Sequence, residues 1–204
     1  MKTVKLSLVL LLLCGALVFG GTIKDYSADQ VDVQSNKVIG KIYATESRLR
    51  LEVFSGDGKL ESFVIVRQDE KKIYTFQEED KTYMEFPILG NNVSIYESLI
   101  SMGQSFGIIP DIKRENQGSE TVSGYKTDKF RTTTTVELFG QRQTTTSYEW
   151  IAAEFDMPIR IQNEDTTVEM RNIKTAKPAA SLFEIPSGYS SLGNMGDLMK
   201  ALGQ

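Results

Sequence analysis

Apolar and polar residues alternate along the chain from Thr22 to about Phe86, with the two-residue period of strands that bury one face. In RLRLEVF, for example, Leu49, Leu51 and Val53 alternate with charged residues. Polar turn sequences separate such stretches at intervals close to the ~8–12 residues typical of sandwiches and barrels. The pattern therefore predicts a meander of short antiparallel strands.

Two local signals predict how strands are joined. Asp57-Gly58 in SGDGKLES is a hairpin turn dipeptide, because both central positions of such a turn favour positive φ. Farther on, the threonine runs 132–135 and 144–146 flank ELFGQR, and β-branched threonine suits strands. We expect these runs to be the facing arms of a long hairpin with Gly140 in its turn. A solvated sheet face explains them better than an ice-like or polysaccharide-binding threonine array.

The period changes between Asn91 and Phe106, where apolar side chains follow one helical stripe. This predicts a helix with Asn92 as its cap. Strands resume after Pro110. Near the end of the chain, apolar residues again recur at helical spacing and predict an amphipathic tail over residues 191–204. These residues are Leu192, Met195, Leu198, Met199 and Leu202.

The amino-terminal residues have the features of a secretory signal peptide. Two lysines precede an apolar run from Leu6 to about Phe19, which is shorter than a membrane-spanning helix requires. Cleavage is expected after Gly20 or Gly21, and no membrane span is expected once the signal is removed. The predicted organisation is a signal peptide over residues 1–20, one β domain over residues 21–190, and the amphipathic tail.

Cys14 lies inside this apolar run and raises the question of a lipid anchor. Lipoprotein processing requires a small residue before the modified cysteine, whereas Leu13 occupies that position. An anchor at Cys14 would also shorten the apolar core to about eight residues. We therefore interpret Cys14 as an apolar residue of a removed segment, and expect a periplasmic or secreted protein.

Charge and composition exclude several classes of function. The 23 Lys and Arg, less Lys2 and Lys5, leave 21 against 27 Asp and Glu, a net charge of −6 that disfavours nucleic-acid binding. The chain has no histidine and only the cysteine discussed above. Catalytic Ser-His-Asp or Cys-His groups, Cys/His zinc sites and disulfides are therefore not expected in the mature chain.

Acidic clusters leave two further alternatives open. The run from Glu78 to Asp80 could supply the carboxylates of a glycosidase, although charge runs at turns are usually solvated. The cluster of Asn163, Glu164, Asp165 and Glu169 could bind calcium, although a hairpin turn explains it as well. We expect no enzyme activity, no cofactor and no metal.

Four motifs in the second half of the chain resemble the periplasmic lipoprotein-carrier (LolA/LolB-like) superfamily, and most closely an uncharacterised exported branch of it. They are the GYKTDKF strand (Gly124 to Phe130), the strand with Trp150, the Pro-led strand Pro158 to Ile161, and the closing FEIPSGY (Phe183 to Tyr189). The first half is matched only by its pattern. The resemblance implies a mainly β, α+β fold: a curved antiparallel sheet that forms an incomplete barrel, with helices plugging its concave side.

In characterised members of that superfamily the cavity between sheet and helices holds lipid acyl chains. The resemblance therefore implies cavity candidates on strands and lid candidates on the helical stripe and the methionine-rich tail, although core packing explains any of them equally well. The cavity candidates are Phe63, Ile65, Tyr74, Phe76, Met84, Phe86, Leu99 and Trp150. The lid candidates are Val93, Tyr96, Ile100, Phe106, Met195 and Met199.

The leading hypothesis from the sequence is a non-enzymatic binding protein for an apolar or amphiphilic ligand, such as a lipid or a lipoprotein acyl chain. The alternative is a module on the same scaffold that senses or binds an envelope protein without a small ligand. The acidic surface, the threonine hairpin and the tail could each contact such a partner.

Overall fold

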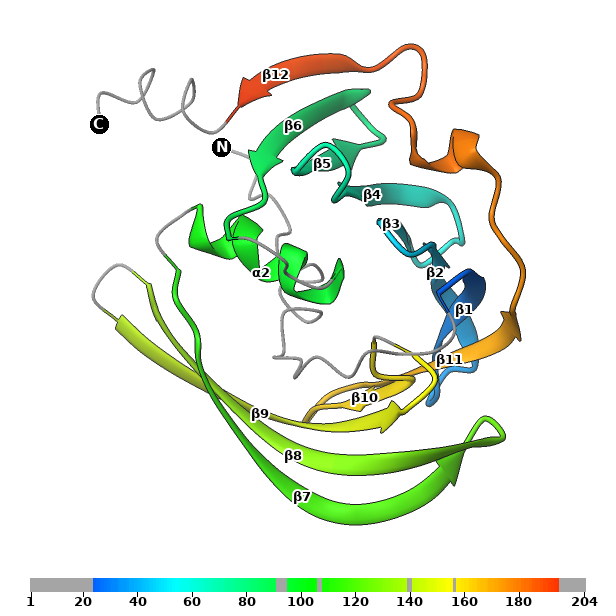
Figure 1. Ribbon diagram of the computed structural model, residues 1–204, viewed down its shortest axis with the longest axis vertical. Coiled ribbons are helices and arrows are strands. Elements are labelled where there is room, and N and C mark those ends of the chain that lie inside the picture. Colours follow the sequence, from blue (N-terminus) through cyan, green and yellow to red (C-terminus); the bar gives the residue numbers. More distant parts are fainter. Residues whose placement is uncertain (1–23, 91–94, 106–107, 139–140, 156, 195–204) are drawn as a thin grey trace.

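The computed structural model describes residues 24–90, 95–105, 108–138, 141–155 and 157–194. The described residues form one sheet of twelve strands in the order β12-β6-β5-β4-β3-β2-β1-β11-β10-β9-β8-β7 (Figure 1). Neighbouring strands are antiparallel except β12, which runs parallel to β6. Since β12 and β7 lie at opposite ends of this order, the sheet stays open. The prediction of a mainly β chain built on an open, curved sheet is confirmed.

The first six strands form a meander. Their bounds are β1 Tyr26–Asp32, β2 Lys37–Ala44, β3 Arg48–Phe54, β4 Leu60–Arg67, β5 Lys72–Gln77 and β6 Thr82–Pro87. The helix α2 (Ile95–Gln104) follows, and the remaining strands are β7 Asp111–Val122, β8 Tyr125–Leu138, β9 Gln141–Ala152, β10 Arg160–Gln162, β11 Thr167–Lys174 and β12 Ser190–Asn194. A short 3-10 helix, η1 (Ala180–Phe183), precedes β12.

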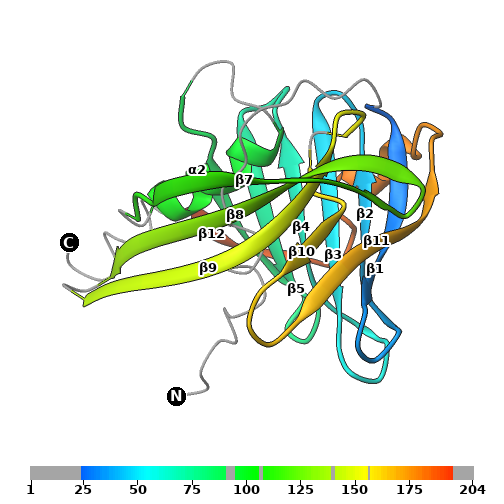
Figure 2. The same cartoon turned by 90° about the horizontal axis from the view of Figure 1, so that it is seen from below.

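The sheet curls around a hollow in which α2 lies (Figure 1). Shifts of register mark a bulge at Ile39 of β2, opposite Gln30 and Val31 of β1, and a bulge in β7 between Asn116 and Ser119. A bulge adds one unpaired residue to a strand and increases its local twist. The long ribbon β7–β9 crosses in front of the meander when viewed from below (Figure 2). The curvature thus brings β7–β9 opposite the first six strands.

The concave face of the meander carries the larger of two hydrophobic cores. Leu49, Leu51 and Val53 are buried on β3 as their alternation predicts, and Leu49 and Leu51 pack in this inner core with Leu99 and Met102 of α2. The helix lies within the predicted range 91–106. The predicted cap, Asn92, lies outside the described residues. The inner core therefore forms because one apolar face of the sheet is covered by one helix.

The opposite, convex face of β4 and β5 carries a second, aromatic core. The rings of Phe63 and Phe76, which are paired across the two strands, stack with their centroids 4.2 Å apart. Phe183 of η1 is 1% exposed in the same cluster, and Tyr189 packs edge-on against both rings. Residues 178–189, here called the covering segment, thus bury the outer face of the sheet.

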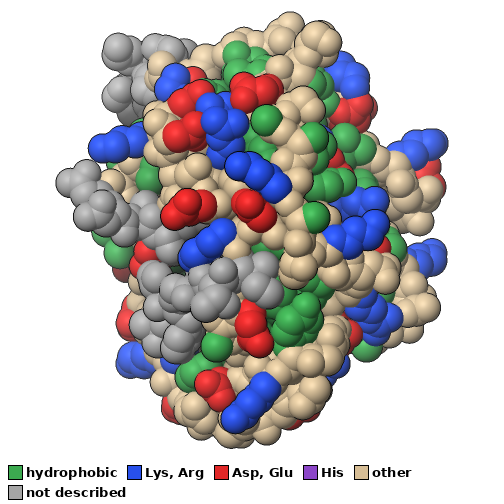
Figure 3. Space-filling view, turned by 45° about the vertical axis from the view of Figure 1, so that its right-hand side comes forward, with side chains coloured by type: hydrophobic (Ala, Val, Ile, Leu, Met, Phe, Trp, Pro, Cys, Tyr) green, Lys and Arg blue, Asp and Glu red, His purple; other side chains and the backbone are tan. Residues whose placement is uncertain are grey.

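Two arginines attach the covering segment to the sheet. Arg50 Nη1 donates to the carbonyl oxygen of Leu182 at 3.2 Å, and its guanidinium lies 4.0 Å from the centre of the Phe63 ring. Arg67 Nη1 donates to the carbonyl oxygen of Phe183 at 3.3 Å and to Glu184 at 3.2 Å. Acidic and basic side chains are interspersed on the side of the molecule shown in Figure 3.

The end of the domain departs from the sequence prediction. Leu192 does not belong to a helical tail, because residues 190–194 form β12 beside β6. The backbone nitrogen of Ser190 donates to the carbonyl oxygen of Lys81 at 2.8 Å, and Gly193 has a φ of 90° that interrupts a helix. The sheet therefore continues past the predicted domain boundary at residue 190. Residues 195–204, with Met195 and Met199, lie outside the described residues.

Both predicted hairpins are confirmed. Thr133 pairs with Thr146 and Thr135 with Thr144 across β8 and β9, and the last pair shares a hydroxyl hydrogen bond of 3.0 Å. Gly140 lies outside the described residues. The Asp57-Gly58 turn joins β3 to β4 as predicted, but of its two residues Gly58 has a positive φ, 80°, and Asp57 does not.

Replacement of Phe183 by alanine should destabilise the fold, because the side chain fills a fully buried aromatic core. We expect a loss of about 3–5 kcal/mol in the free energy of unfolding, measured by urea denaturation. Ile185→Ala, in the same segment but 41% exposed, serves as the control and should change stability by less than about 0.5 kcal/mol. Equal effects of the two substitutions would contradict the covering role of the segment.

Candidate ligand-binding site

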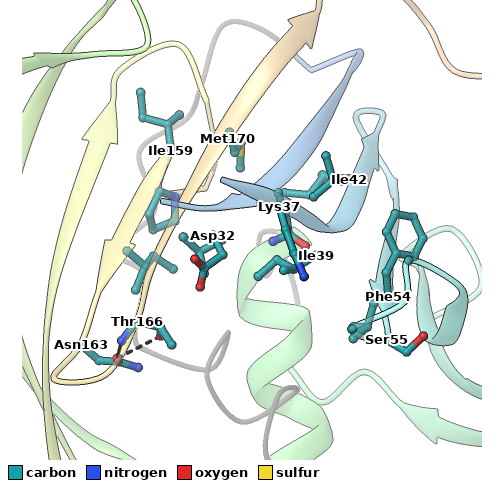
Figure 4. A pocket seen from close by; sticks show the side chains of 18 of the residues that line it. Asp32, Lys37, Ile39, Ile42, Phe54, Ser55, Ile159, Asn163, Thr166 and Met170 are labelled. Atoms are coloured by element: carbon teal, nitrogen blue, oxygen red, sulfur yellow. Dashed lines mark hydrogen bonds between the residues drawn. The ribbon is translucent and has the colours of Figure 1, made fainter. Parts of the chain in front are cut away.

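A cleft of about 540 Å³ lies at one end of the concave face. One wall comes from the adjacent ends of β1, β2 and β3, and the other from residues 157–161 and the β10–β11 hairpin (Figure 4). The lining comprises Gln30, Asp32, Lys37, Val38, Ile39, Ile42, Val53, Phe54, Met157, Pro158, Ile159, Ile161, Asn163, Thr166, Val168 and Met170, with turn residues 55–58.

Apolar side chains form the interior of the cleft. Ile42 and Ile159 are fully buried and Met170 is 3% exposed, whereas Val38 is 39% exposed at the mouth. Because aliphatic and thioether groups line most of the wall, the interior offers dispersion contacts and few directed hydrogen bonds. The cleft therefore suits an apolar chain that enters from the solvent side.

Charged groups are confined to the mouth of the cleft. Hydrogen bonds from the backbone nitrogen and hydroxyl of Ser35 hold the pKa of Asp32 below its usual range. Hydrogen bonds from Lys59 and Ser55 likewise lower the pKa of Asp57. A general acid at neutral pH needs a carboxyl pKa raised towards 7, so both shifts have the wrong sign for that role. Neither Asp32 nor Asp57 is therefore suited to act as a general acid at neutral pH.

The structure places four predicted cavity residues away from the cleft. Phe63, Ile65, Tyr74 and Phe76 belong to the outer core, beneath the covering segment. They alternate along β4 and β5 with the residues of the inner core, so they face the opposite side of the sheet. The prediction that they line a cavity on the concave side is therefore wrong, because their aromatic face is filled by Phe183 and Tyr189.

Trp150 also lies outside the lining of the cleft. It pairs with Arg160 of β10, whereas its neighbour Glu149 pairs with the cleft residue Ile161. The indole nitrogen donates to Glu120 at 2.5 Å, and Lys129 Nζ lies 4.6 Å from the ring centre. Trp150 is 3% exposed, belongs to the inner core and lies beside Lys129 and Arg160, but it does not line the cleft.

The other predicted residues lie on or near α2. Phe86 and Leu99 are buried in the inner core, and Met84 is half-buried against it. Ile100 is half-buried on α2, which packs against β4, β5 and β6. As far as the chain is described, α2 contributes nothing to the lining of the cleft. Val93 and Phe106 lie outside the described residues, as does the side chain of Tyr96.

Sequence reasoning missed the residues that do line the cleft. Val38, Ile39 and Ile42 belong to the apolar stretch KVIGKIY, and Ile159 and Ile161 belong to the Pro-led strand that carries part of the family resemblance. The available signal was their position at strand ends, where neighbouring strands diverge. Large aromatic residues were the more conspicuous candidates, but they pack in the outer core.

A second polar feature lies on the cleft-facing side of the long ribbon. Arg114 of β7 donates from Nη2 to Glu149 Oε2 of β9 at 2.6 Å, and the two side chains are 6% and 0% exposed. Thr132 of β8 and Ser147 of β9 are buried beside them and paired across the strands. We call Arg114, Thr132, Ser147 and Glu149 the inner polar cluster.

Burial dominates the protonation of Glu149. Removal of its carboxylate from water raises the pKa of Glu149 to about 7, although the positive charge of Arg114 opposes the shift. Ionisation of Glu149 in this buried place therefore costs free energy. Near neutral pH, both the protonated and the ionised forms of Glu149 are populated.

The predicted calcium alternative is explained by turn geometry. Asn163 Oδ1 accepts hydrogen bonds from the backbone nitrogens of Asp165 and Thr166, at 3.0 and 2.8 Å, and from the Thr166 hydroxyl. The Asn163 side chain thus closes the β10–β11 hairpin. Within the described part of the chain, no group of three or more acidic side chains is placed to hold a metal ion.

A search for helices able to cross a lipid bilayer gave none among the residues described.

Replacement of Glu149 by glutamine should change how stability depends on pH. Between pH 4.5, the usual carboxyl value, and about 7, the folded protein keeps the proton that the unfolded chain loses, so stability falls as pH rises. Glu149→Gln removes this loss. We expect its free energy of unfolding, relative to the parent protein, to rise by up to about 3 kcal/mol across this range.

Urea denaturation at several pH values measures this difference. Thr133→Val, a half-buried substitution on β8 that removes no titratable group, is the control and should show a difference that does not vary with pH. A flat difference for Glu149→Gln would contradict the raised pKa.

Comparisons with known proteins add information about the fold. No protein-family model matches the chain, and no curated protein matches it. An uncharacterized conserved protein from Thermus thermophilus is similar in structure, with a TM-score of 0.51, 12% identity, and coverage of 84% of this chain and 91% of that one. At that identity the likeness shows a shared fold alone.

Two weaker likenesses follow. MucB matches with a TM-score of 0.46 and 12% identity over 91% of this chain and 64% of MucB. A candidate lipoprotein from Parabacteroides distasonis matches with a TM-score of 0.41 and 8% identity over 78% of this chain and all of that one. The chain is therefore similar in fold to the Thermus protein, and no activity or ligand follows from these comparisons.

Proposed function

We propose that this protein is a non-enzymatic, exported binding protein that holds an apolar or amphiphilic ligand, such as a lipid or a lipoprotein acyl chain, in the cleft between β1–β3 and the β10–β11 hairpin. The observation that carries the proposal is the unfilled apolar cleft on the concave side of the sheet. The export part of the proposal rests on the amino-terminal lysines and the apolar run that follows them.

The size and lining of the cleft fit this function. A volume of about 540 Å³ lies within the range of roughly 300–1,000 Å³ typical of small-ligand sites. Each buried methylene contributes about 0.8 kcal/mol, so a chain of about ten methylenes would contribute about 8 kcal/mol. Association itself costs an estimated 4–15 kcal/mol. A long acyl chain is therefore the class of ligand that this site would retain.

The cleft also permits exchange of its ligand. Its mouth is formed by Val38, by Lys37 and by the exposed turn around Asp57, while its interior is fully buried. A ligand would thus enter along an apolar path bordered by charged groups. Such a site sequesters a chain without a chemical step, which agrees with the lowered pKa values of Asp32 and Asp57.

Replacement of Val38 by aspartate should weaken ligand binding, because it places a carboxylate where the ligand contacts the mouth. The uncharged fluorescent probe N-phenyl-1-naphthylamine reports occupancy of an apolar site by its emission. We expect the parent protein to bind the probe, and Val38→Asp to raise its Kd by about tenfold, which corresponds to about 1.4 kcal/mol.

Ile185→Asp is the matched control. Ile185 is 41% exposed, close to the 39% of Val38, and lies in the covering segment, so both variants change the net charge equally. The control should bind the probe as the parent does. If the parent shows no binding of the probe or of a fluorescent fatty acid, the carrier proposal fails, and the module that recognises an envelope protein becomes the better hypothesis.

A further inference from the structure

The inner polar cluster adjoins the cleft through the pairing of two strands. Ile161, which lines the cleft, is directly opposite Glu149 in the register of β10 and β9. Residues opposite each other in an antiparallel pair project from the same face of a sheet. Ser147, two residues before Glu149, shares that face, and its partner Thr132 extends the cluster to β8. The cluster therefore continues the wall that Ile161 begins.

The inner polar cluster is buried but not satisfied. Arg114 Nη2 donates to Glu149 Oε2, and a side-chain hydrogen bond from Thr132 also lowers the pKa of Glu149. Three other buried atoms, Arg114 Nε, Arg114 Nη1 and Ser147 Oγ, have no hydrogen-bond partner among the described residues. Buried polar groups in folded proteins are nearly always paired, so a group of unpaired atoms in one place needs an explanation. One explanation is a bound ligand that supplies the missing hydrogen-bond partners.

The unpaired atoms define the chemistry of that partner. Arg114 has two unpaired nitrogens, Nε and Nη1, whose N–H groups point to different sides of the guanidinium, and the Ser147 hydroxyl can also donate. Donors of this kind match the oxygens of a carboxylate or a phosphate, because hydrogen bonds from a guanidinium to such an anion are charge-assisted. Burial favours the protonated form of Glu149 by raising its pKa, which reduces the repulsion that an anion would meet there.

We propose that the inner polar cluster binds the anionic head group of an amphiphile, a carboxylate or a phosphate monoester, whose acyl chain lies in the adjoining cleft. The inference rests on the proposed function and specifies its ligand class. It divides the hollow into an apolar part around Ile42, Ile159 and Met170 and a polar part around Arg114.

Three amphiphiles with one oleoyl chain test this assignment: oleate, oleoyl lysophosphatidate and uncharged monoolein. Their Kd values are measured on the purified protein by displacement of N-phenyl-1-naphthylamine. We expect at least one of the two anions to bind about tenfold tighter than monoolein, because hydrogen bonds to a charged group are stronger than those to a neutral one. The tighter of the two identifies the head group as carboxylate or phosphate.

The double substitution Thr132→Val with Ser147→Ala removes two donors while keeping the side-chain volumes similar. It should abolish most of the preference for the anions and leave the Kd of monoolein unchanged. Thr133→Val with Thr146→Ala is the matched control, since these half-buried residues pair on the opposite face of the same two strands. The control should keep the preference. If the double variant does not fold, Thr132→Val alone is measured in the same way.

The outcomes separate this inference from the proposed function. Equal binding of all three amphiphiles, or an anion preference that the inner double variant retains, would overturn the head-group assignment and leave the apolar cleft intact as a binding site. Failure of all three to bind would overturn the proposed function itself.

Discussion

Arg50 and Arg67 hold the covering segment against the convex face of the sheet, which leaves the concave face as the one on which the cleft lies. Their guanidinium groups bind the carbonyl oxygens of Leu182 and Phe183, which places an aromatic side chain over the convex face of β4 and β5. With α2 on the other face, the middle of the meander is covered on both sides. On the concave face, the cleft lies where the described part of α2 contributes nothing to its lining.

The sequence predicts the strands well because their alternation is local, but it does not predict which face of a strand meets a cavity. In KIYTFQ, Ile73 lies in the inner core while Tyr74 and Phe76 lie in the outer one. Both faces of this strand carry apolar residues, so the sequence pattern does not indicate which face lies on the concave side of the sheet. The residue that decides the matter is Phe183, more than one hundred positions later in the chain. Contacts of that separation leave no mark on local periodicity.

The cleft could not be derived from the sequence for a related reason. Its walls are strand ends, and their spacing is set by bulges and close approaches of the backbone. At Gly40 an added Cβ would lie 2.3 Å from the carbonyl oxygen of Glu52 and 2.7 Å from the side-chain oxygen of Gln30, so only glycine lets β2 take its place there. The sequence shows that Gly40 lies within an apolar stretch, but it does not show that Glu52 and Gln30 lie close to it.

The inner core and the inner polar cluster contribute differently to the stability of the folded protein. The inner core contributes stability through burial, whereas the inner polar cluster leaves buried groups unpaired at about 1–3 kcal/mol each. Replacement of a buried ion pair by apolar residues is often neutral or stabilising, so stability alone gives no reason for Arg114 and Glu149 to lie there. A wholly apolar ligand would leave this cost in place, while a ligand with a polar head would remove it. The proposed head-group site would therefore give the inner polar cluster a role that stability alone does not explain.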